Sequence, residues 1–325
     1  MPSLLVRLDA IRHNAALIAQ ACLRAGTHCL PVLKTAALHP RIIQATAEGG
    51  AFRALGTIAW PGRGMSPFDG LELHHIYAPS DSLAAAMGNF STVYVSSRYE
   101  LNLLLEHCRE ARPALRISLE CGDGRDGLLP EELDSFCHEA VRLGFPIRGL
   151  ALNFACMSDR APTLHALQEA ERSLDIVRSF APDADISAGG TDILELAGSS
   201  PLPASIGEIR CGTGIFLGVY PLSGKAIPGA RHDAFSLEST VLECRIKEGR
   251  KLALCDFGHF HTASRRITPA VPGMKLHGSS SSYTVFDLSE CPEDIQEGQR
   301  LHFGCDYHSL LCALSSQALP VVFTA

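Results

Sequence analysis

The chain has 325 residues, 46% of them hydrophobic and 19% charged, which leaves room for two domains or one large barrel and disfavours intrinsic disorder and a coiled coil. The formal net charge is -7 and no basic run occurs, so a nucleic-acid partner is not expected. Because the N-terminus has no apolar signal segment and no apolar stretch reaches about 18 residues, we expect a cytoplasmic protein without a membrane partner.

The chain begins with a predicted helix that has Asp9 as its N-cap and ends at Gly26. Eight short β-like runs come next, at residues 29–34, 52–58, 75–78, 92–96, 115–121, 147–154, 185–189 and 206–211. Amphipathic helices separate most of these runs. The clearest runs from Pro130 to Gly144, and its predicted inward face is Leu133, Phe136, Cys137, Ala140 and Val141. Another covers residues 161–180, with Leu164, Leu167, Leu174 and Val177 inward.

The alternation of strands and helices predicts a parallel sheet, and eight units in about 220 residues fit a closed (β/α)8 TIM barrel over residues 1–228. A doubly wound open sheet is the alternative, but no G-x-G-x-x-G motif follows the first strand. From residue 229 to 325 the apolar runs are separated by Gly, Ser and Pro without crossover helices. This pattern predicts a C-terminal β domain.

Twelve cysteines are scattered along the chain without a C-x-x-C pair, and a chain of this length folds without disulfides. We interpret them as reduced and mostly buried, and we expect no metal. Cys305, His308 and Cys312 are the closest approach to a metal site, but structural zinc sites usually show four ligands in two tight pairs.

Lys34 ends the first β-like run, directly after three apolar residues. At the C-terminal end of a barrel strand, where the reacting groups of such barrels lie, an amine that loses solvation can attack a carbonyl and form a Schiff base. Taken alone, the pattern is more typical of a lysine that only extends from a strand end into solvent.

Glycine-rich loops follow the seventh and eighth runs. Gly190 and Thr191 come after one, and Gly212 and Thr213 after the other. Glycines let backbone N–H groups approach an anion, and barrels commonly bind phosphate at this pair of loops. A Schiff-base lysine with a phosphate site predicts the cofactor pyridoxal 5'-phosphate, PLP.

With these residues in place, the chain resembles the fold-type III PLP enzymes of the alanine racemase superfamily, most closely the ornithine racemase branch. The resemblance covers nearly the whole length. It is carried by a first strand and helix over residues 4–25, the Lys34 strand, Gly122-x-Gly124-Arg125-x-Gly127, the Gly190-Thr191 loop, Glu208-Ile209-Arg210-x-Gly212-Thr213, Gly273-Met274-Lys275 and Asp306-Tyr307. The order and spacing of these motifs are specific, although each alone is weak.

The resemblance implies roles for individual residues. Lys34 matches the lysine that holds PLP and moves the Cα proton on one face of the substrate. Arg210 matches the arginine that faces the pyridine nitrogen, which then stays unprotonated, so the proton returns to Cα rather than to the cofactor. The remaining cofactor contacts implied are the phosphate loops Gly190, Thr191, Gly212 and Thr213, with Tyr307, Arg125 and Asn153.

Three of these residues also have a purely structural interpretation. Arg210 could pair with Glu208, Arg125 could be a surface residue in a turn, and Asn153 could satisfy buried backbone groups.

Two departures from the family pattern bear on the chemistry. Ser118 stands where many alanine racemases have a carbamylated lysine. The loop after Glu243 is short and lacks the tyrosine that supplies the second acid/base from the partner subunit. His259 falls at a strand-end position that faces the neighbouring site in the family, and His261 is its rival. An ordinary solvent-facing pair is the alternative interpretation.

The sequence therefore predicts a PLP-dependent amino-acid racemase that exchanges the Cα proton through a Lys34 Schiff base, with His259 as the second base. A homodimer is expected, each β domain completing the partner's site. Two other functions remain open: a PLP-dependent lyase acting on D-amino acids, and a non-catalytic PLP-binding protein.

Overall fold

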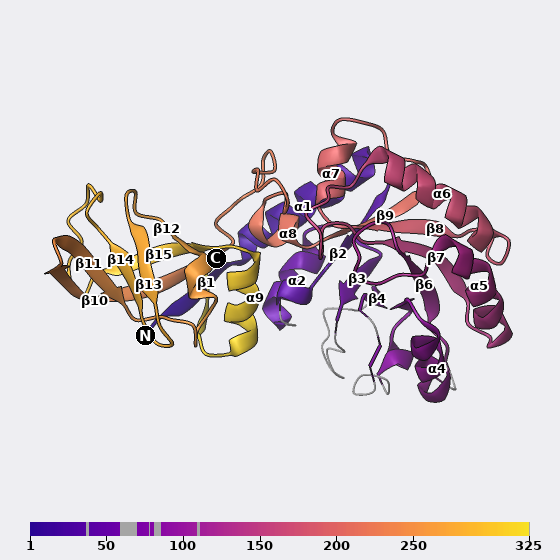
Figure 1. Ribbon diagram of the computed structural model, residues 1–325, viewed down its shortest axis with the longest axis horizontal. Coiled ribbons are helices and arrows are strands. Elements are labelled where there is room, and N and C mark those ends of the chain that lie inside the picture. Colours follow the sequence, from indigo (N-terminus) through magenta and orange to yellow (C-terminus); the bar gives the residue numbers. More distant parts are fainter. Residues whose placement is uncertain (37–38, 59–69, 78, 81–85, 109–110, 325) are drawn as a thin grey trace. The chain divides into compact units, whose positions relative to one another are not determined.

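The computed structural model describes residues 1–36, 39–58, 70–77, 79–80, 86–108 and 111–324. The chain forms two compact units, one made of residues 1–11, 35–42 and 231–325, the other of residues 12–34 and 43–230 (Figure 1). None of the described helices is long and apolar enough to cross a membrane.

The unit of residues 12–34 and 43–230, the barrel unit, is built on eight parallel strands in the order β2-β9-β8-β7-β6-β5-β4-β3. A parallel bridge between Val32 and Gly56 joins the two ends of this order. The strands are β2 (His28–Pro31), β3 (Ala54–Thr57), β4 (Glu72–His75), β5 (Thr92–Val95), β6 (Ala114–Leu119), β7 (Ile147–Leu152), β8 (Asp185–Gly189) and β9 (Ile206–Cys211). The predicted eight-stranded parallel barrel is confirmed. Ala78, the last residue of the predicted third run, lies outside the described residues.

Helices follow most strands, and α5 and α6 lie beside β7 (Figure 1). Their bounds are α1 (Leu8–Arg24), α2 (Pro40–Glu48), α4 (Arg98–His107), α5 (Leu133–Arg142), α6 (Leu164–Arg178), α7 (Asp192–Ala197) and α8 (Thr213–Leu217), with short 3-10 turns η1 (Lys34–Ala36), η3 (Met87–Asn89) and η4 (Pro130–Glu132).

Two helix details differ from the prediction. α1 begins at Leu8, so Asp9 lies in its first turn instead of capping it. Val141 is 48% exposed, because the inward stripe of α5 consists of Leu133, Phe136, Cys137 and Ala140.

The second unit, the sheet unit, contains a sheet in the order β12-β15-β10-β11-β14-β13, and β1 pairs with both β10 and β16. Its elements are β1 (Ser3–Arg7), β10 (Phe235–Lys247), β11 (Arg250–Cys255), η5 (Ser264–Arg266), β12 (Ile267–Pro269), β13 (Lys275–Ser279), β14 (Thr284–Asp287), β15 (Arg300–Cys305), α9 (Tyr307–Ser316) and β16 (Val321–Thr324). The predicted C-terminal β domain is confirmed, and its strands pair antiparallel except that β16 runs parallel to β1.

The placement of β1 differs from the predicted division at residue 228. Leu4 and Val6 are fully buried, and β1 is hydrogen-bonded to β10 and β16 instead of to a barrel strand. The sequence predicts β1 to be part of the barrel, because it directly precedes a barrel helix. Its hydrogen bonds to β10 and β16 place it in the sheet unit.

Candidate active site

The Lys34 side chain begins in η1, immediately after the strand that joins the barrel ends. The Leu33 N–H donates to the Gly56 carbonyl, which fixes the backbone at this point. Lys34 is half-buried, whereas Leu33 and Thr35 on either side are buried. In a parallel barrel this is the end at which β7, β8 and β9 also finish, so Lys34 shares it with Asn153, Gly190 and Arg210.

Arg210, on β9, is buried, and four hydrogen bonds hold its guanidinium. Nη1 donates to the carbonyl and the hydroxyl of Ser187, at 2.7 and 2.9 Å. Nη2 donates to the Leu152 carbonyl at 2.5 Å and to Oδ1 of Asn153 at 2.8 Å. Neutral acceptors therefore hold Arg210. Asn153 is one of these acceptors, a contact that neither the cofactor role nor the backbone role predicted for Asn153 includes.

Gly189, the last residue of β8, makes room for Arg210. A Cβ atom at this position would overlap Nη2 of Arg210 and would lie 3.1 Å from the Leu152 carbonyl oxygen. The next residue, Gly190, would meet nothing within 4 Å. Of these two adjacent glycines, the first is required by packing and the second borders open space.

Glu208 does not bond Arg210 directly; Ser187 links the two. Ser187 accepts from Arg210, and its hydroxyl lies 2.5 Å from Oε1 of Glu208, to which it donates. Tyr94 also donates to Oε1 at 3.1 Å. Burial raises the pKa of Glu208, but the nearby charges of Arg116 and His74 and the hydrogen bonds outweigh it, so that the pKa is lowered. The interior of the barrel thus contains an ionised carboxylate.

The same interior holds further charged groups. Arg116 is 1% exposed and pairs with Asp185. His74 is fully buried, with Nδ1 3.8 Å from Glu208, and burial lowers its pKa. Burial also raises the pKa of Tyr94 to about 12. A connected set of polar groups therefore runs inside the strands to Arg210, and we call it the barrel network: His74, Tyr94, Arg116, Asp185, Ser187, Glu208 and Arg210.

The loops after β8 and β9 are joined by Thr191. Its hydroxyl accepts from the Gly214 N–H at 3.1 Å and also bonds Cys211, and the residue is 1% exposed. Gly212 precedes α8, and a Cβ atom there would lie 3.2 Å from the Val32 carbonyl oxygen. The Thr191 side chain serves to hold the loops together, which leaves backbone N–H groups and Thr213 as the donors the loops can offer an anion.

Arg125 and Asn153 line a cavity of about 230 Å³ together with Ile76, Tyr77, Tyr94, Val95, Ser96, Ser118 and Asp126. Arg125 donates to Asp126 at 2.5 Å, and its exposed fraction is 36%. Ser118, the position of the missing lysine, is therefore in the wall of the same cavity.

The loop that carries Arg125 is held by Asp123. Oδ1 of Asp123 accepts from three successive backbone N–H groups, those of Cys156, Met157 and Ser158. Burial raises the pKa of Asp123, but these hydrogen bonds outweigh it and lower the pKa.

In the sheet unit, His259 lies in a turn four residues beyond β11, so the expected strand-end position of His259 is wrong. His259 is exposed, and its Nδ1 lies 2.9 Å from the hydroxyl of the fully buried Ser264. His261 instead accepts a hydrogen bond from the Gly258 N–H, and burial lowers its pKa. Of these two histidines, His259 is the one that combines exposure with an anchored ring.

Tyr307 is the first residue of α9, and its neighbour Asp306 caps this helix by accepting from the Ser309 N–H at 2.8 Å. Burial raises the pKa of Cys305 to about 12. Among the described residues, Cys305, His308 and Cys312 do not bring their ligand atoms together as a metal site requires.

Comparison with known families identifies the chain. The model of the family "Alanine racemase, N-terminal domain" matches residues 6–221. The protein belongs to the alanine racemase family. This confirms the resemblance seen in the sequence, and the fold of a parallel barrel followed by an antiparallel sheet agrees with it.

Two curated relatives of this alanine racemase-family protein are themselves named for racemisation. The lysine racemase of Thermotoga maritima is 24% identical over 99% of this chain and 98% of the relative. The ornithine racemase of Acetoanaerobium sticklandii is 23% identical over 62% of this chain and 64% of the relative.

Solved structures share the fold at low identity. An alanine racemase from Bartonella henselae with covalently bound pyridoxal phosphate has a TM-score of 0.75 and 16% identity, and the match covers 99% of each chain. A D-threonine aldolase from Filomicrobium marinum has a TM-score of 0.78 and 16% identity, covering 97% of this chain and 89% of the other. The fold alone therefore does not separate a racemase from an aldolase.

Sequence reasoning missed several groups of the barrel network, namely Tyr94, Ser187, Arg116 and His74. The alternation of side chains along a strand could have identified them, because polar residues at every second position of a buried strand face the barrel interior. Arg116 and Ser118 of β6 follow this rule, as do Glu208 and Arg210 of β9.

Proposed function

We propose that this member of the alanine racemase family is a PLP-dependent amino-acid racemase. The observation that carries the proposal is the environment of Arg210, whose guanidinium is held by carbonyl, hydroxyl and amide oxygens at the end of the barrel that carries Lys34. An arginine cannot give up its proton to a neighbouring ring nitrogen, so a cofactor ring beside it stays unprotonated. Such a ring favours return of the proton to Cα.

The residues present fit PLP. Lys34 offers an amine for the aldehyde, Arg210 a fixed cation for the ring, and the loops after β8 and β9 offer backbone donors for the phosphate. The open space beside Gly190 leaves these donors accessible. Arg125, Asn153 and Ser118, in the wall of the cavity, would contact the cofactor or the substrate carboxylate.

PLP, when bound, supplies the electron sink that makes the Cα–H bond of an amino acid acidic. The protein's own part is to move the proton. Nζ of Lys34 takes it from one face of Cα and returns it there in the reverse direction. His259 of the partner subunit gives and takes it on the opposite face. An imidazole is suited to both steps near neutral pH, and Ser264 fixes the ring through Nδ1 so that Nε2 is the exchanging atom.

The substrates we propose first are lysine and ornithine, because these name the two curated relatives. Both substrates carry a cationic side chain, and Asp126, which pairs with Arg125, places a carboxylate in the cavity wall where this side chain could exchange for the arginine. The lyase alternative predicts different products from D-amino acids, and a non-catalytic PLP carrier predicts none, so product analysis separates all three.

Borohydride reduction followed by peptide mapping tests the cofactor site. The purified protein should be yellow, its absorbance band should shift on reduction, and the reduced adduct should map to Lys34. Lys34→Ala should lose the band and turnover. Lys225→Ala is the matched control, because Lys225 is 72% exposed and pairs with Glu195 on the surface. An adduct on another lysine would overturn the assignment.

Separate His259→Ala and His261→Ala variants test the second base. His259→Ala should abolish racemisation while keeping PLP and the Lys34-dependent exchange of one enantiomer's Cα proton. His261→Ala should stay active. Full activity in the double variant would show that another group supplies the second proton.

Mixing two inactive variants tests the shared site. We propose a C2 homodimer, so chains with Lys34→Ala combined with chains with His259→Ala should regain about one site per mixed dimer. An active monomer would contradict this.

A further inference from the structure

Three buried thiols converge on the outer face of the barrel sheet. Cys22 lies on α1, Cys29 on β2 and Cys211 on β9, and their sulfur atoms all lie within 4.8 Å of one another. Cys22 and Cys211 are fully buried and Cys29 is 8% exposed. We call this group the thiol cluster. None of its members takes part in the proposed racemase chemistry.

The convergence follows from strand register. Cys29 pairs with Ile209 and Pro31 pairs with Cys211 in the parallel ladder of β2 and β9, so the two cysteines lie diagonally on one face. Because side chains alternate along a strand, Cys211 points away from the face of Arg210. α1 covers this outer face and adds Cys22 from the next layer.

The spacing of the sulfurs suits a metal ion. A single buried cysteine packs as a small apolar residue and needs no ligand. Three converging thiols have nearly the spacing of a metal site, because metal–sulfur bonds of about 2.3 Å place the sulfurs of one site about 4 Å apart. The observed limit of 4.8 Å needs only a small rotation of the side chains to reach that geometry.

The donor set selects a soft cation. The group contains sulfur alone, with no carboxylate or imidazole among its ligand atoms. Thiolates favour Cu(I) and Zn(II), but a structural zinc site is almost always four-coordinate. Within the described part of the chain the cluster has no fourth ligand, and three buried sulfurs alone favour Cu(I).

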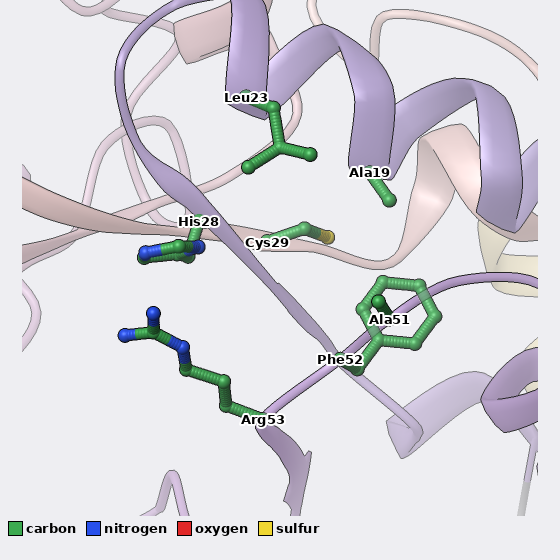
Figure 2. Close-up of a pocket in the computed structure, with 7 residues that line it drawn as sticks. All are labelled: Ala19, Leu23, His28, Cys29, Ala51, Phe52 and Arg53. Atoms are coloured by element: carbon green, nitrogen blue, oxygen red, sulfur yellow. The ribbon is translucent and has the colours of Figure 1, made fainter.

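A small pocket reaches Cys29, one member of the cluster. It has a volume of about 40 Å³ and is lined by Cys29, His28 and Arg53, with Ala19, Leu23, Ala51 and Phe52. Figure 2 shows the Cys29 sulfur pointing between Ala19 and Phe52, while the His28 ring and the Arg53 guanidinium lie near each other. The Arg53 charge at this opening opposes the excess negative charge that one Cu(I) and three thiolates would carry.

We propose that Cys22, Cys29 and Cys211 form a binding site for monovalent copper. On binding, each ligating thiol releases its proton to solvent and forms one copper–sulfur bond, with no change in oxidation state. The ligands face the helix layer and not the barrel interior, and Thr191, which bonds Cys211, links the site to the loop after β8.

Competition with a chromophoric Cu(I) chelator under reducing, oxygen-free conditions tests the proposal on the whole protein. The wild-type chain should withdraw one Cu(I) per chain. Cys22→Ser, Cys29→Ser and Cys211→Ser should each weaken binding by about 100-fold or more, because each removes one of three ligands. Cys137→Ser is the matched control, since Cys137 is equally buried but lies on α5, and it should bind as the wild type does.

X-ray absorption at the copper edge keeps the test decisive even where a variant folds poorly. The wild-type complex should show three sulfur neighbours and no nitrogen neighbour. Two sulfurs, a nitrogen ligand or unchanged binding in all three variants would overturn the proposal. So would tighter binding of Zn(II) than of Cu(I), or a disulfide among these residues with no Cu(I) binding after its reduction.

Discussion

The interiors of the two units are built from different residue types. Inside the barrel, His74, Arg116 and Glu208 are buried together with their hydrogen-bond partners. Inside the sheet unit, Phe257, Phe286 and Phe303 pack on one another, with the rings of Phe286 and Phe303 stacked at 5.1 Å. The two units are therefore stabilised in different ways. The sheet unit is stabilised by apolar burial, whereas the barrel gives up apolar core volume to fix the Arg210 guanidinium.

The stability of the two units should depend differently on pH. Aromatic packing contains no titrating group, so the stability it provides does not change with pH. The barrel network contains a carboxylate with a lowered pKa and a phenol with a raised pKa, and its stability should decline toward both extremes.

Phe303→Ala should have the largest effect on stability. The ring is 1% exposed and contacts two other aromatic rings, so its loss should lower the free energy of unfolding by about 3 to 5 kcal/mol. Urea unfolding should show this decrease at pH 5 and at pH 8 alike. Ile246→Ala is the control, because Ile246 is 78% exposed, and it should change stability by less than about 0.5 kcal/mol. A loss below about 1 kcal/mol at Phe303 would contradict the apolar description of this unit.

Glu208→Gln should lower the free energy of unfolding by about 3 kcal/mol near pH 7, because it leaves the charges of Arg116 and Arg210 without their buried carboxylate. A carboxylate whose folded pKa is lowered stabilises the protein above its unfolded pKa and loses that contribution as pH falls through the folded pKa. The gap between wild type and variant should therefore be constant above about pH 5 and shrink below about pH 4. A gap that widens in acid would contradict an ionised Glu208.

Tyr94→Phe tests the alkaline side. The pKa of Tyr94 is raised to about 12, chiefly by burial, whereas the unfolded chain ionises near 10. Stability present below pH 10 is thus lost as pH rises toward 12, by about 2 kcal/mol for this residue. Urea unfolding across that interval should show a shallower loss in the Phe variant. Equal slopes would mean that the Tyr94 phenol is not held neutral.

Gly189→Ala should have the smallest effect on stability and a selective effect on chemistry. Its methyl group would displace Arg210. This should lower the free energy of unfolding by about 1 to 3 kcal/mol and lower kcat about tenfold or more. Gly190→Ala adds its methyl group to open space and should change stability by less than about 0.5 kcal/mol. Equal effects of the two substitutions on stability would show that Arg210 has freedom to move aside.

The fold was predictable because strand and helix alternate with regular spacing from Cys29 to Cys211, and a closed parallel barrel is the arrangement that fits eight such units. The assignment of β1 was not predictable in the same way, since it depends on pairing with β10, more than 200 residues away.

The candidate site was only partly predictable for a related reason. Lys34, Arg210 and the glycine loops stand out because each ends a strand. Tyr94, Ser187 and Glu208 meet through the register of separate strands, which no local pattern encodes. The turn that carries His259 was likewise hidden, because a strand ending at Cys255 looks much like one that continues.

Chiral analysis of lysine and ornithine incubated with enzyme and PLP in deuterated water tests the central claim most directly. Starting from either enantiomer, the account predicts both enantiomers in the product, with deuterium at Cα, and no exchange in Lys34→Ala. Formation of a keto acid or an aldehyde from a β-hydroxy D-amino acid, with lysine and ornithine left unchanged, would identify a lyase, and Cα exchange confined to one enantiomer would contradict two-base racemisation.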